Sequence, residues 1–377
     1  MRRLLALVGA IVFLDTMFFV ALTPLLPHYA DRFGLSKVGA GVLAAAYPAG
    51  VLFAGLPSGF ASARFGPRAT VVAALVVMAG TTLAFGLAND IYVLDGARFA
   101  QGVVSACAWT AGFAWLIGRA PAARRGELIG TALGTAIVGA LFGPVLGGLA
   151  SLAGTAAIFG SVGGAALLLA VAAAAAPPAP TAPAPPMRTI RSAVRSRPVA
   201  AGIWLVALPA LYFGTQSVLA PLRLSALGLG ALGIAVVYVV SAGLEAAVNP
   251  IVGRFSDRRG RRLPITVALA GVGLAAALLP WPDHRVLLAV VLVAGAVGAG
   301  AMWTPAMSLV TDASEARGVP PAFSFALINL AWAPGQALGS SAGGALADLT
   351  GDALPYLLLA GLCLLTLGAL WRSGSSS

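Results

Sequence analysis

The chain contains few charged residues for its length. Of its 377 residues, 9% are Asp, Glu, Lys or Arg, whereas 59% are hydrophobic. A typical soluble domain has about 25% charged residues and about 45–50% apolar ones. So few charges cannot cover the surface of a soluble protein of this size. The composition therefore predicts a polytopic membrane protein.

Cysteine and histidine are scarce as well. Cys107 and Cys363 both lie inside apolar runs, and His28 and His284 are the only histidines. Neither a disulfide framework nor a thiolate cluster can be built from two such cysteines, and a zinc or haem site would lack ligands. We therefore expect no metal and no cofactor. An enzyme is also not expected, because no nucleophile–base cluster can be assembled from these residues.

Apolar segments long enough to cross a bilayer, which takes about 20 residues each, recur along the whole chain. The expected fold class is all-α, with twelve transmembrane helices in two six-helix bundles. We expect an N-terminal bundle at 1–176, a linker at 177–197 and a C-terminal bundle at 198–377. The expected spans are 4–27, 37–60, 69–88, 92–118, 128–151, 155–176, 198–221, 228–252, 263–280, 286–310, 321–346 and 353–371.

The basic residues are distributed unevenly between the two sides of this topology. Residues 177–197 hold six prolines followed by four arginines, a composition that fits a loop and not a membrane helix. Most of the 23 lysines and arginines lie on the side that also holds both termini and this linker. The positive-inside rule places that side in the cytoplasm. The net charge of +11 is thus explained by membrane orientation, and nucleic acid is not an expected partner.

The two halves of the sequence resemble each other. Gly59-x6-Gly66 recurs 194 residues later as Gly253-x6-Gly260, and Trp109-Thr110 recurs at the same offset as Trp303-Thr304. A further glycine-rich pattern that begins at Gly143 recurs at Gly339. Parallel repeats of six helices place a binding site at their interface, near the middle of the membrane. The repeat therefore predicts a transporter that works by alternating access.

Residues 253–262 read Gly-Arg-Phe-Ser-Asp-Arg-Arg-Gly-Arg-Arg. This stretch resembles the loop signature of the major facilitator superfamily, and the resemblance covers essentially the whole chain. It implies that this loop gates the cytoplasmic side, through Gly253, Asp257, Arg258, Gly260 and Arg261. The alternative is a basic loop that only sets orientation. The N-terminal copy at 59–68 lacks the acid, since Ala63 stands in its place, so any latch there should be weaker.

Two further motifs resemble signatures of the same family. Arg98-x-x-Gln101-Gly102 is similar to its fourth-helix motif, whose buried arginine is linked to proton transfer; alternatively, Arg98 snorkels to the outer surface. A pattern in the fifth span resembles the motif of drug/proton antiporters, and its glycines would let a neighbouring helix approach closely. That pattern consists of Gly139, Gly143, Pro144, Gly147 and Gly148.

Two acidic residues lie within expected spans. Asp15 is close to the midplane of the first span, where an ionised carboxylate costs about 2.5–3.5 kcal/mol, so we expect it to carry the transported proton. The alternative is a structural pair with Arg98 that never titrates. Glu245 in the eighth span is either a second proton or cation site or a partner of the arginines at 253–262.

Aromatic and polar residues complete the expected cavity, because such walls suit lipophilic cations through burial and cation–π attraction. The expected substrate-binding residues are Tyr47, Trp109, Tyr212, Gln216, Trp303, Asn329 and Trp332. The pattern around Leu14-Asp15-Thr16-Met17 also resembles the vesicular amine transporters and their bacterial multidrug relatives. That branch carries further acids in its tenth and eleventh spans, where this chain has Gly300 and Asn329.

The expected function is export of a small hydrophobic or cationic compound in exchange for protons, as in multidrug efflux. The alternative is a proton-coupled or facilitative importer or exporter of a neutral metabolite, such as a sugar, on the same fold. Asp15 is the expected proton carrier and Arg98 its modulator. The expected partners are a small-molecule substrate, protons and the lipid bilayer, and the expected state is a monomer in the inner (plasma) membrane.

Overall fold

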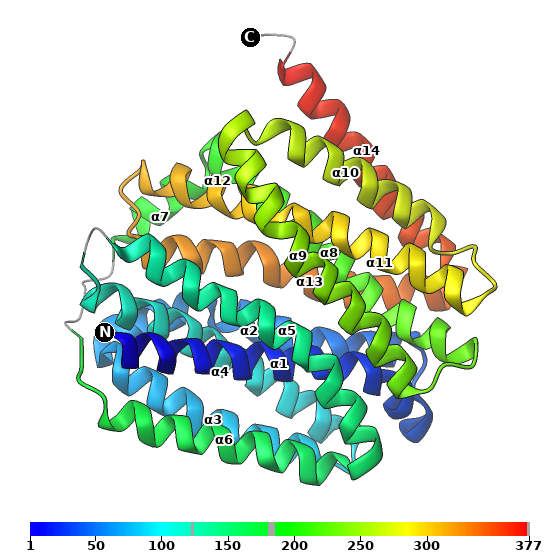
Figure 1. The fold of residues 1–377 in the computed structure, drawn as a ribbon, viewed down its shortest axis with the longest axis horizontal. Coiled ribbons are helices and arrows are strands. Elements are labelled where there is room, and N and C mark those ends of the chain that lie inside the picture. Colours follow the sequence, from blue (N-terminus) through cyan, green and yellow to red (C-terminus); the bar gives the residue numbers. More distant parts are fainter. Residues whose placement is uncertain (122–123, 180–184, 375–377) are drawn as a thin grey trace.

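The chain forms a bundle of long helices joined by short turns (Figure 1). A computed structural model describes residues 1–121, 124–179 and 185–374. The helices are α1 (Arg2–Phe33), α2 (Lys37–Phe65), α3 (Pro67–Leu87), α4 (Ile91–Arg119), α5 (Arg125–Ala153), α6 (Thr155–Ala175), α7 (Met187–Val194), α8 (Arg197–Ala226), α9 (Ala231–Arg259), α10 (Arg262–Leu278), α11 (Arg285–Ala301), α12 (Trp303–Glu315), α13 (Pro321–Thr350) and α14 (Ala353–Gly374).

The number of membrane-crossing segments agrees with the expected fold. Ten segments are long and apolar enough to cross a membrane, counting α11 and α12 together as one. The shorter apolar helix α10 and the 30-residue α13 bring the number of long segments in the described chain to twelve. The all-α membrane fold is therefore confirmed.

The tenth span differs from the continuous helix expected at 286–310. It is interrupted at Met302, where α11 ends and α12 begins. Pro305 follows three residues later, and a proline nitrogen has no hydrogen to donate to the carbonyl of Ala301. The break therefore has a local cause.

The residues expected to link the halves contain one short helix of their own. α7 begins directly after Pro186 and buries Ile190 and Ala193, while Arg188 and Arg191 are exposed. The proline-rich stretch 180–184 lies outside the described residues. The boundaries of the linker and of the two bundles stay a prediction.

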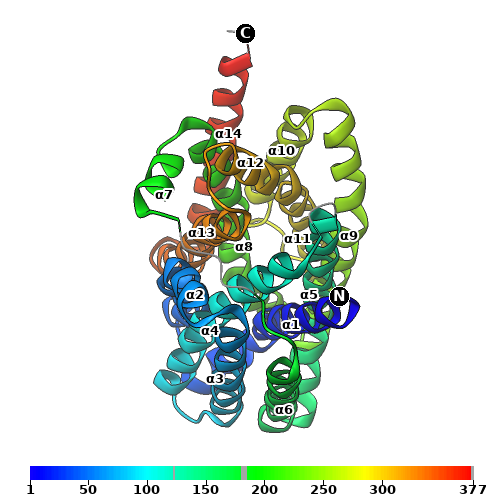
Figure 2. The same cartoon turned by 90° about the vertical axis from the view of Figure 1, so that its left-hand side faces the viewer.

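The helices gather into two groups that follow the order of the sequence. Figure 2 looks along the bundle and shows α1–α6 on one side and α8–α14 on the other. α2 packs against α13, and α5 packs against α9, so these two pairs join the groups. The site described below lies between the groups.

One end of the α2–α13 contact is closed very tightly. A Cβ at Gly41 would lie 2.5 Å from the carbonyl oxygen of Ser340, and one at Gly344 would lie 2.3 Å from that of Lys37. Nearby, Lys37 Nζ lies 2.6 Å from Asp352 Oδ1. This is the end opposite the two termini, because α2 begins there and α13 ends there. Only glycine allows the two backbones to approach so closely.

Candidate functional site

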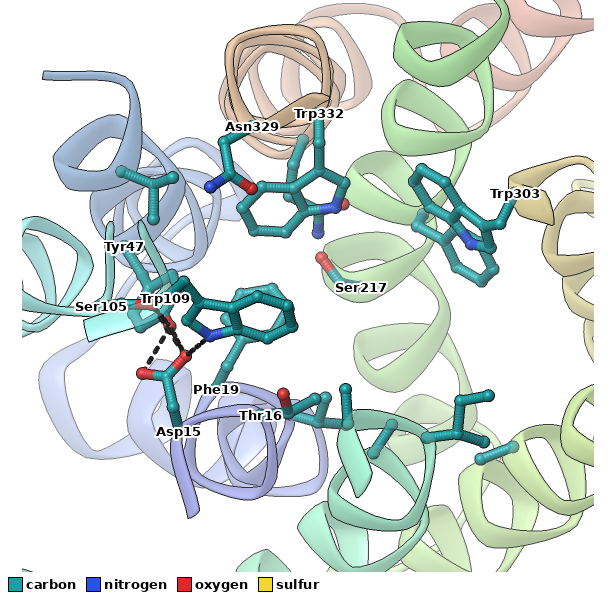
Figure 3. A pocket seen from close by; sticks show the side chains of 18 of the residues that line it. Asp15, Thr16, Phe19, Tyr47, Ser105, Trp109, Ser217, Trp303, Asn329 and Trp332 are labelled. Carbon is teal, nitrogen blue, oxygen red and sulfur yellow. Dashed lines mark hydrogen bonds between the residues drawn. The ribbon is translucent and has the colours of Figure 1, made fainter. Parts of the chain in front are cut away.

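A cavity of about 500 Å³ lies between the two groups of helices. Figure 3 shows Asp15 and Trp109 on one side of it, Trp303 on another, and Asn329 and Trp332 above. The cavity is within the range of small-molecule sites, and apolar and aromatic side chains predominate among its walls. The residues expected at the site that line it are Asp15, Tyr47, Arg98, Trp109, Pro144, Gln216, Glu245, Trp303, Asn329 and Trp332.

Asp15 is held by three side chains that donate hydrogen bonds. Ser105 Oγ and Trp109 Nε1 each lie 2.7 Å from Asp15 Oδ2, and Tyr47 Oη lies 2.9–3.0 Å from both carboxylate oxygens. Tyr47 Oη also lies 2.7 Å from Ser105 Oγ. Asp15 itself is 3% exposed. These hydrogen bonds take the place of hydrogen bonds to water that the carboxylate loses on burial.

Close packing of α2 against α4 through glycines brings Tyr47 of α2 beside the two donors of α4. A Cβ at Gly102 would lie 1.9 Å from the carbonyl oxygen of Tyr47, and one at Gly50 would lie 2.0 Å from that of Phe99. Ser105 and Trp109 are four residues apart on α4 and therefore share a face of that helix. Gly102, which the sequence singled out, thus positions the Tyr47 side chain.

Arg98 is fully enclosed and does not snorkel to the surface. It is 1% exposed, and its guanidinium carbon lies 5.0–5.8 Å from the centres of four aromatic rings. These rings belong to Phe18, Phe19, Tyr47 and Phe85. Such distances are those of cation–π contacts, which are worth more when they are desolvated. The snorkelling alternative is therefore wrong.

Arg98 makes little use of its hydrogen-bonding groups. Its Nη2 donates to the backbone oxygen of Phe19 at 3.2 Å, while Nε and Nη1 are buried and have no partner. The ion pairs of the described chain do not include a direct pair between Arg98 and Asp15. Tyr47 connects the two residues instead, since its hydroxyl contacts Asp15 and its ring faces Arg98.

The other members of the two motifs pack helices together. Gln101 points away from the cavity and donates to the backbone oxygen of Thr81 in α3. On α5, a Cβ at any of Gly139, Gly143 and Gly147 would lie 2.2–2.7 Å from the nearest atom of α1. Gly148 instead faces α9, with Leu232 and Ala235 just over 3 Å from such a Cβ. Three of the four glycines therefore let α5 pack closely against α1, the helix that carries Asp15.

Glu245 lies on the C-terminal side of the cavity, against Gly300. A Cβ at Gly300 would be 2.3–2.6 Å from the Cγ, Cδ and Oε1 atoms of Glu245, so the glycine makes room for the carboxylate. The arginines at 254 and 261 have other partners, the backbone oxygen of Pro250 and Asp312. Within the described residues Glu245 has no ion pair, so the expected alternative of a pair with the loop is not observed.

Aromatic rings form much of the remaining wall. Phe213 and Trp303 are stacked, with ring centres 6.1 Å apart and an angle of 6° between the planes. Across the cavity, Phe19 meets the Trp332 ring edge-on and lies 4.7 Å from the ring centre of Tyr47. Phe213 and Phe19 were not expected at the site. Their signal in the sequence was weak, because phenylalanine in an apolar helix is usually a packing residue.

Tyr212 is the expected wall residue that the structure places elsewhere. Its side chain is fully buried in the C-terminal group, and its hydroxyl is directed at Gly295 of α11 and has no hydrogen-bond partner. Its neighbour Phe213 faces the cavity instead. One residue corresponds to about 100° around a helix, so the expectation was wrong by one position.

The loop at 253–262 forms one ion pair with a residue that was not anticipated. Arg261 Nη2 lies 2.5 Å from Asp312 Oδ2, which joins the start of α10 to α12. Arg258 is exposed, and the side chain of Asp257 lies outside the described residues. Gly260 has φ +85°, a conformation that favours glycine and permits the turn between α9 and α10.

Ser105 is another residue of the candidate site that the sequence did not single out. It donates to Asp15 and lies seven residues after Arg98 and four before Trp109. These spacings put all three on one side of α4. That periodicity was a usable signal, because two members of the set had already been singled out.

Among curated proteins, the chain is similar to a resistance protein and to MFS-type transporters. A chloramphenicol resistance protein of Streptomyces lividans is 28% identical over 370 residues, which cover 94% of this chain and 88% of that protein. The MFS-type transporter ppzB of Metarhizium rileyi (strain RCEF 4871) is 30% identical over 166 residues, 42% of this chain. The match spans only 34% of that fungal protein.

Comparisons with solved structures and family models agree. A bacterial homologue of the human lysosomal transporter Spinster has a TM-score of 0.80 at 14% identity, over 99% of this chain and 96% of that one. A D-xylose–proton symporter has a TM-score of 0.74 at 17% identity, over 98% and 96%. At these identities the likeness concerns the fold. The model of the Major Facilitator Superfamily matches residues 6–335. The chain belongs to the major facilitator superfamily of membrane transporters.

Proposed function

We propose that this transporter exports a small hydrophobic or cationic compound in exchange for protons. The observation that carries the proposal is the setting of Asp15, a carboxylate buried beside the cavity among three side-chain donors. A buried ionisable residue within a membrane helix is expensive and marks a functional site. Asp15 is the group that we expect to gain and lose the transported proton.

The hydroxyl groups around Asp15 suit both of its protonation states. Ionised Asp15 accepts hydrogen bonds from Ser105, Trp109 and Tyr47. Protonated Asp15 needs an acceptor, and a serine or tyrosine oxygen can accept as well as donate after its hydrogen rotates. Trp109 can only donate, so it favours the ionised form. The network can therefore follow a change of protonation without leaving a polar group unpaired.

The walls of the cavity support a lipophilic substrate. Trp303 and Phe213 on one side, and Phe19 and Trp332 on the other, present aromatic faces and edges. Such rings bind apolar groups by burial and cations by their quadrupoles. The Streptomyces lividans relative is named a resistance protein, which supports export rather than uptake.

Alternating access would use the contacts between the two groups of helices. We assign the inner face of the plasma membrane to the end that holds both termini, and we treat 1–176 and 198–377 as the two moving bundles. The Lys37–Asp352 pair and the α2–α13 glycines would hold the outer end closed. The Arg261–Asp312 pair ties together helices of the C-terminal bundle on the inner side.

The experiment is proton movement in proteoliposomes that carry the purified transporter. Tetraphenylphosphonium or ethidium is added, and proton release is followed with a pH-sensitive dye in the wild type and in Asp15→Asn. Asparagine keeps the size and most of the hydrogen bonds of Asp15 but cannot release a proton. We expect substrate-dependent proton movement in the wild type and none in the variant.

Two outcomes would contradict the proposal in different ways. Proton movement that persists in Asp15→Asn would keep antiport but assign the proton to another group. Uptake of a neutral solute such as a sugar, with no response to either cation, would identify a transporter of a neutral metabolite. Asp31→Asn, a change on α1 outside the cavity lining, is the matched control and should behave as the wild type.

A further inference from the structure

The two carboxylates at the cavity differ sharply in their surroundings. Asp15 accepts hydrogen bonds from three neutral side chains, and the Arg98 cation lies just behind Tyr47. Glu245 has Asn249, one helical turn away, as its hydrogen-bonding side chain. Among the described residues no ion pair involves Glu245. Glu245 is thus the carboxylate with unused capacity to accept hydrogen bonds.

Arg98 makes the Asp15 side of the cavity unsuitable for a second positive charge. Its guanidinium carbon is 5.0 Å from the centre of the Tyr47 ring, and Tyr47 touches Asp15. A substrate cation placed on Asp15 would therefore lie close to a buried arginine. Like charges in a poorly solvated site repel each other strongly, because the effective dielectric constant is low. Nothing comparable opposes a cation at Glu245 in the described part of the cavity wall.

The surroundings of Glu245 fit a substrate cation. Tyr238, Ser241, Glu245 and Asn249 all line the cavity, and their spacing along α9 puts them on one face of the helix. The stacked rings of Phe213 and Trp303 line the same cavity. A carboxylate combined with aromatic rings provides charge neutralisation and cation–π attraction together.

Gly300 leaves the space that the Glu245 carboxylate occupies. A Cβ at this position would overlap the Glu245 carboxylate at 2.3–2.6 Å. Even alanine would therefore move the carboxylate from its present place. Gly298, two residues earlier on α11, offers a contrast: its Cβ would meet Val272 at an ordinary 3.4 Å.

We infer that Glu245 binds the positively charged group of the substrate, while Asp15 carries the proton. The two charges are then held on separate bundles, α9 and α1, and not exchanged at a single carboxylate. The inference rests on the proposed antiport and adds the class of substrate, a lipophilic monovalent cation. It also identifies Gly300 as a positioning residue for Glu245.

The test measures two quantities on the same purified full-length protein. Binding of tetraphenylphosphonium is measured by equilibrium dialysis, and the protons released on binding are measured in weakly buffered solution. For Glu245→Gln we expect affinity to fall about tenfold or more, as when one member of a buried charge pair is removed. For Asp15→Asn we expect affinity to fall less than for Glu245→Gln and proton release to be lost, because the cation contact stays while the proton carrier is gone.

Matched variants separate charge from position. Gly300→Ala removes no charge, but like Glu245→Gln it should weaken tetraphenylphosphonium binding. Gly298→Ala should leave the binding unchanged. Glu127→Gln changes an exposed glutamate that pairs with Arg124, away from the cavity, and should leave both readouts unchanged. Size-exclusion profiles and thermal melting show whether each variant is folded.

The results distinguish this inference from the proposed function. If Asp15→Asn loses affinity for the cation while Glu245→Gln keeps it, the assignment of the two carboxylates is overturned but antiport stands. If Glu245→Gln abolishes proton release with unchanged affinity, Glu245 is a proton site and the inference is wrong. If the wild type binds no tetraphenylphosphonium and releases no protons, the proposed function fails, and the inference fails with it.

Discussion

Tyr47 joins Asp15 to Arg98 by two different interactions. Its hydroxyl lies 2.9 Å from Asp15 Oδ2, and the centre of its ring lies 5.0 Å from the guanidinium carbon of Arg98. Asp15 and Arg98 are therefore linked through the Tyr47 side chain and not by a direct salt bridge. The arrangement keeps the carboxylate free of a direct ionic partner, which suits the role of proton carrier proposed for Asp15.

Removing the Tyr47 hydroxyl should change the pH dependence of the transporter. Tyr47→Phe keeps the ring over Arg98 but takes one donor from ionised Asp15. A hydrogen bond to a charged group contributes about 1.5–3 kcal/mol, so the variant should destabilise ionised Asp15 by a similar amount. We expect the midpoint of proton release on substrate binding to move to higher pH by about 1–2 units. Tyr92→Phe, on an exposed tyrosine at the start of α4, should leave the midpoint unchanged.

Filling the contact between α2 and α4 should disrupt the site. Gly102→Ala places a methyl group 1.9 Å from the carbonyl oxygen of Tyr47, which the two helices can relieve only by moving apart. Overpacking of this kind costs about 1–3 kcal/mol. We expect a lower melting temperature and loss of substrate-dependent proton movement. Gly96→Ala in the same helix, with nothing within 4 Å, should be neutral or slightly stabilising; equal melting temperatures for the two variants would contradict the packing argument.

The Tyr212 hydroxyl should be dispensable. It is buried, has no hydrogen-bond partner and lies outside the cavity wall. Removing an unsatisfied buried group is nearly neutral or stabilising, so Tyr212→Phe should keep substrate affinity and melt at the same or a higher temperature. Trp303→Ala, by contrast, removes a wall of the cavity and should lower tetraphenylphosphonium affinity. Loss of affinity in Tyr212→Phe would restore this residue to the site.

The Lys37–Asp352 pair should favour the conformation in which the end of the bundle opposite the termini is closed. Lys37→Ala removes a partly exposed ion pair between α2 and the turn before α14, worth about 1 kcal/mol or less. Spin labels are placed at the start of α2 and the start of α14, and the distance between them is measured by double electron–electron resonance. We expect Lys37→Ala to populate long distances more than the wild type does. The swapped variant Lys37→Asp with Asp352→Lys should recover the wild-type distribution. A swap that behaves like Lys37→Ala would argue against an electrostatic bias.

The sequence predicted the helical parts of the fold well, for a simple reason. A run of about twenty mostly apolar residues, such as α3, can satisfy its backbone hydrogen bonds in a bilayer only as a helix. The same argument does not say which face of a helix meets a cavity. For this reason Asp15 was found by its charge, whereas Tyr212 was chosen in place of Phe213.

The sequence therefore determined the membrane location, the helical segments, the repeat of the two halves and the rare charges within the spans. These depend on composition and on the cost of burying charge, which act residue by residue. Only the tertiary structure decided that Tyr47 and Ser105 satisfy Asp15, that four rings enclose Arg98, and that Glu245 rests on Gly300. These contacts join residues up to 90 positions apart on different helices, and helix packing alone fixes which of their faces meet.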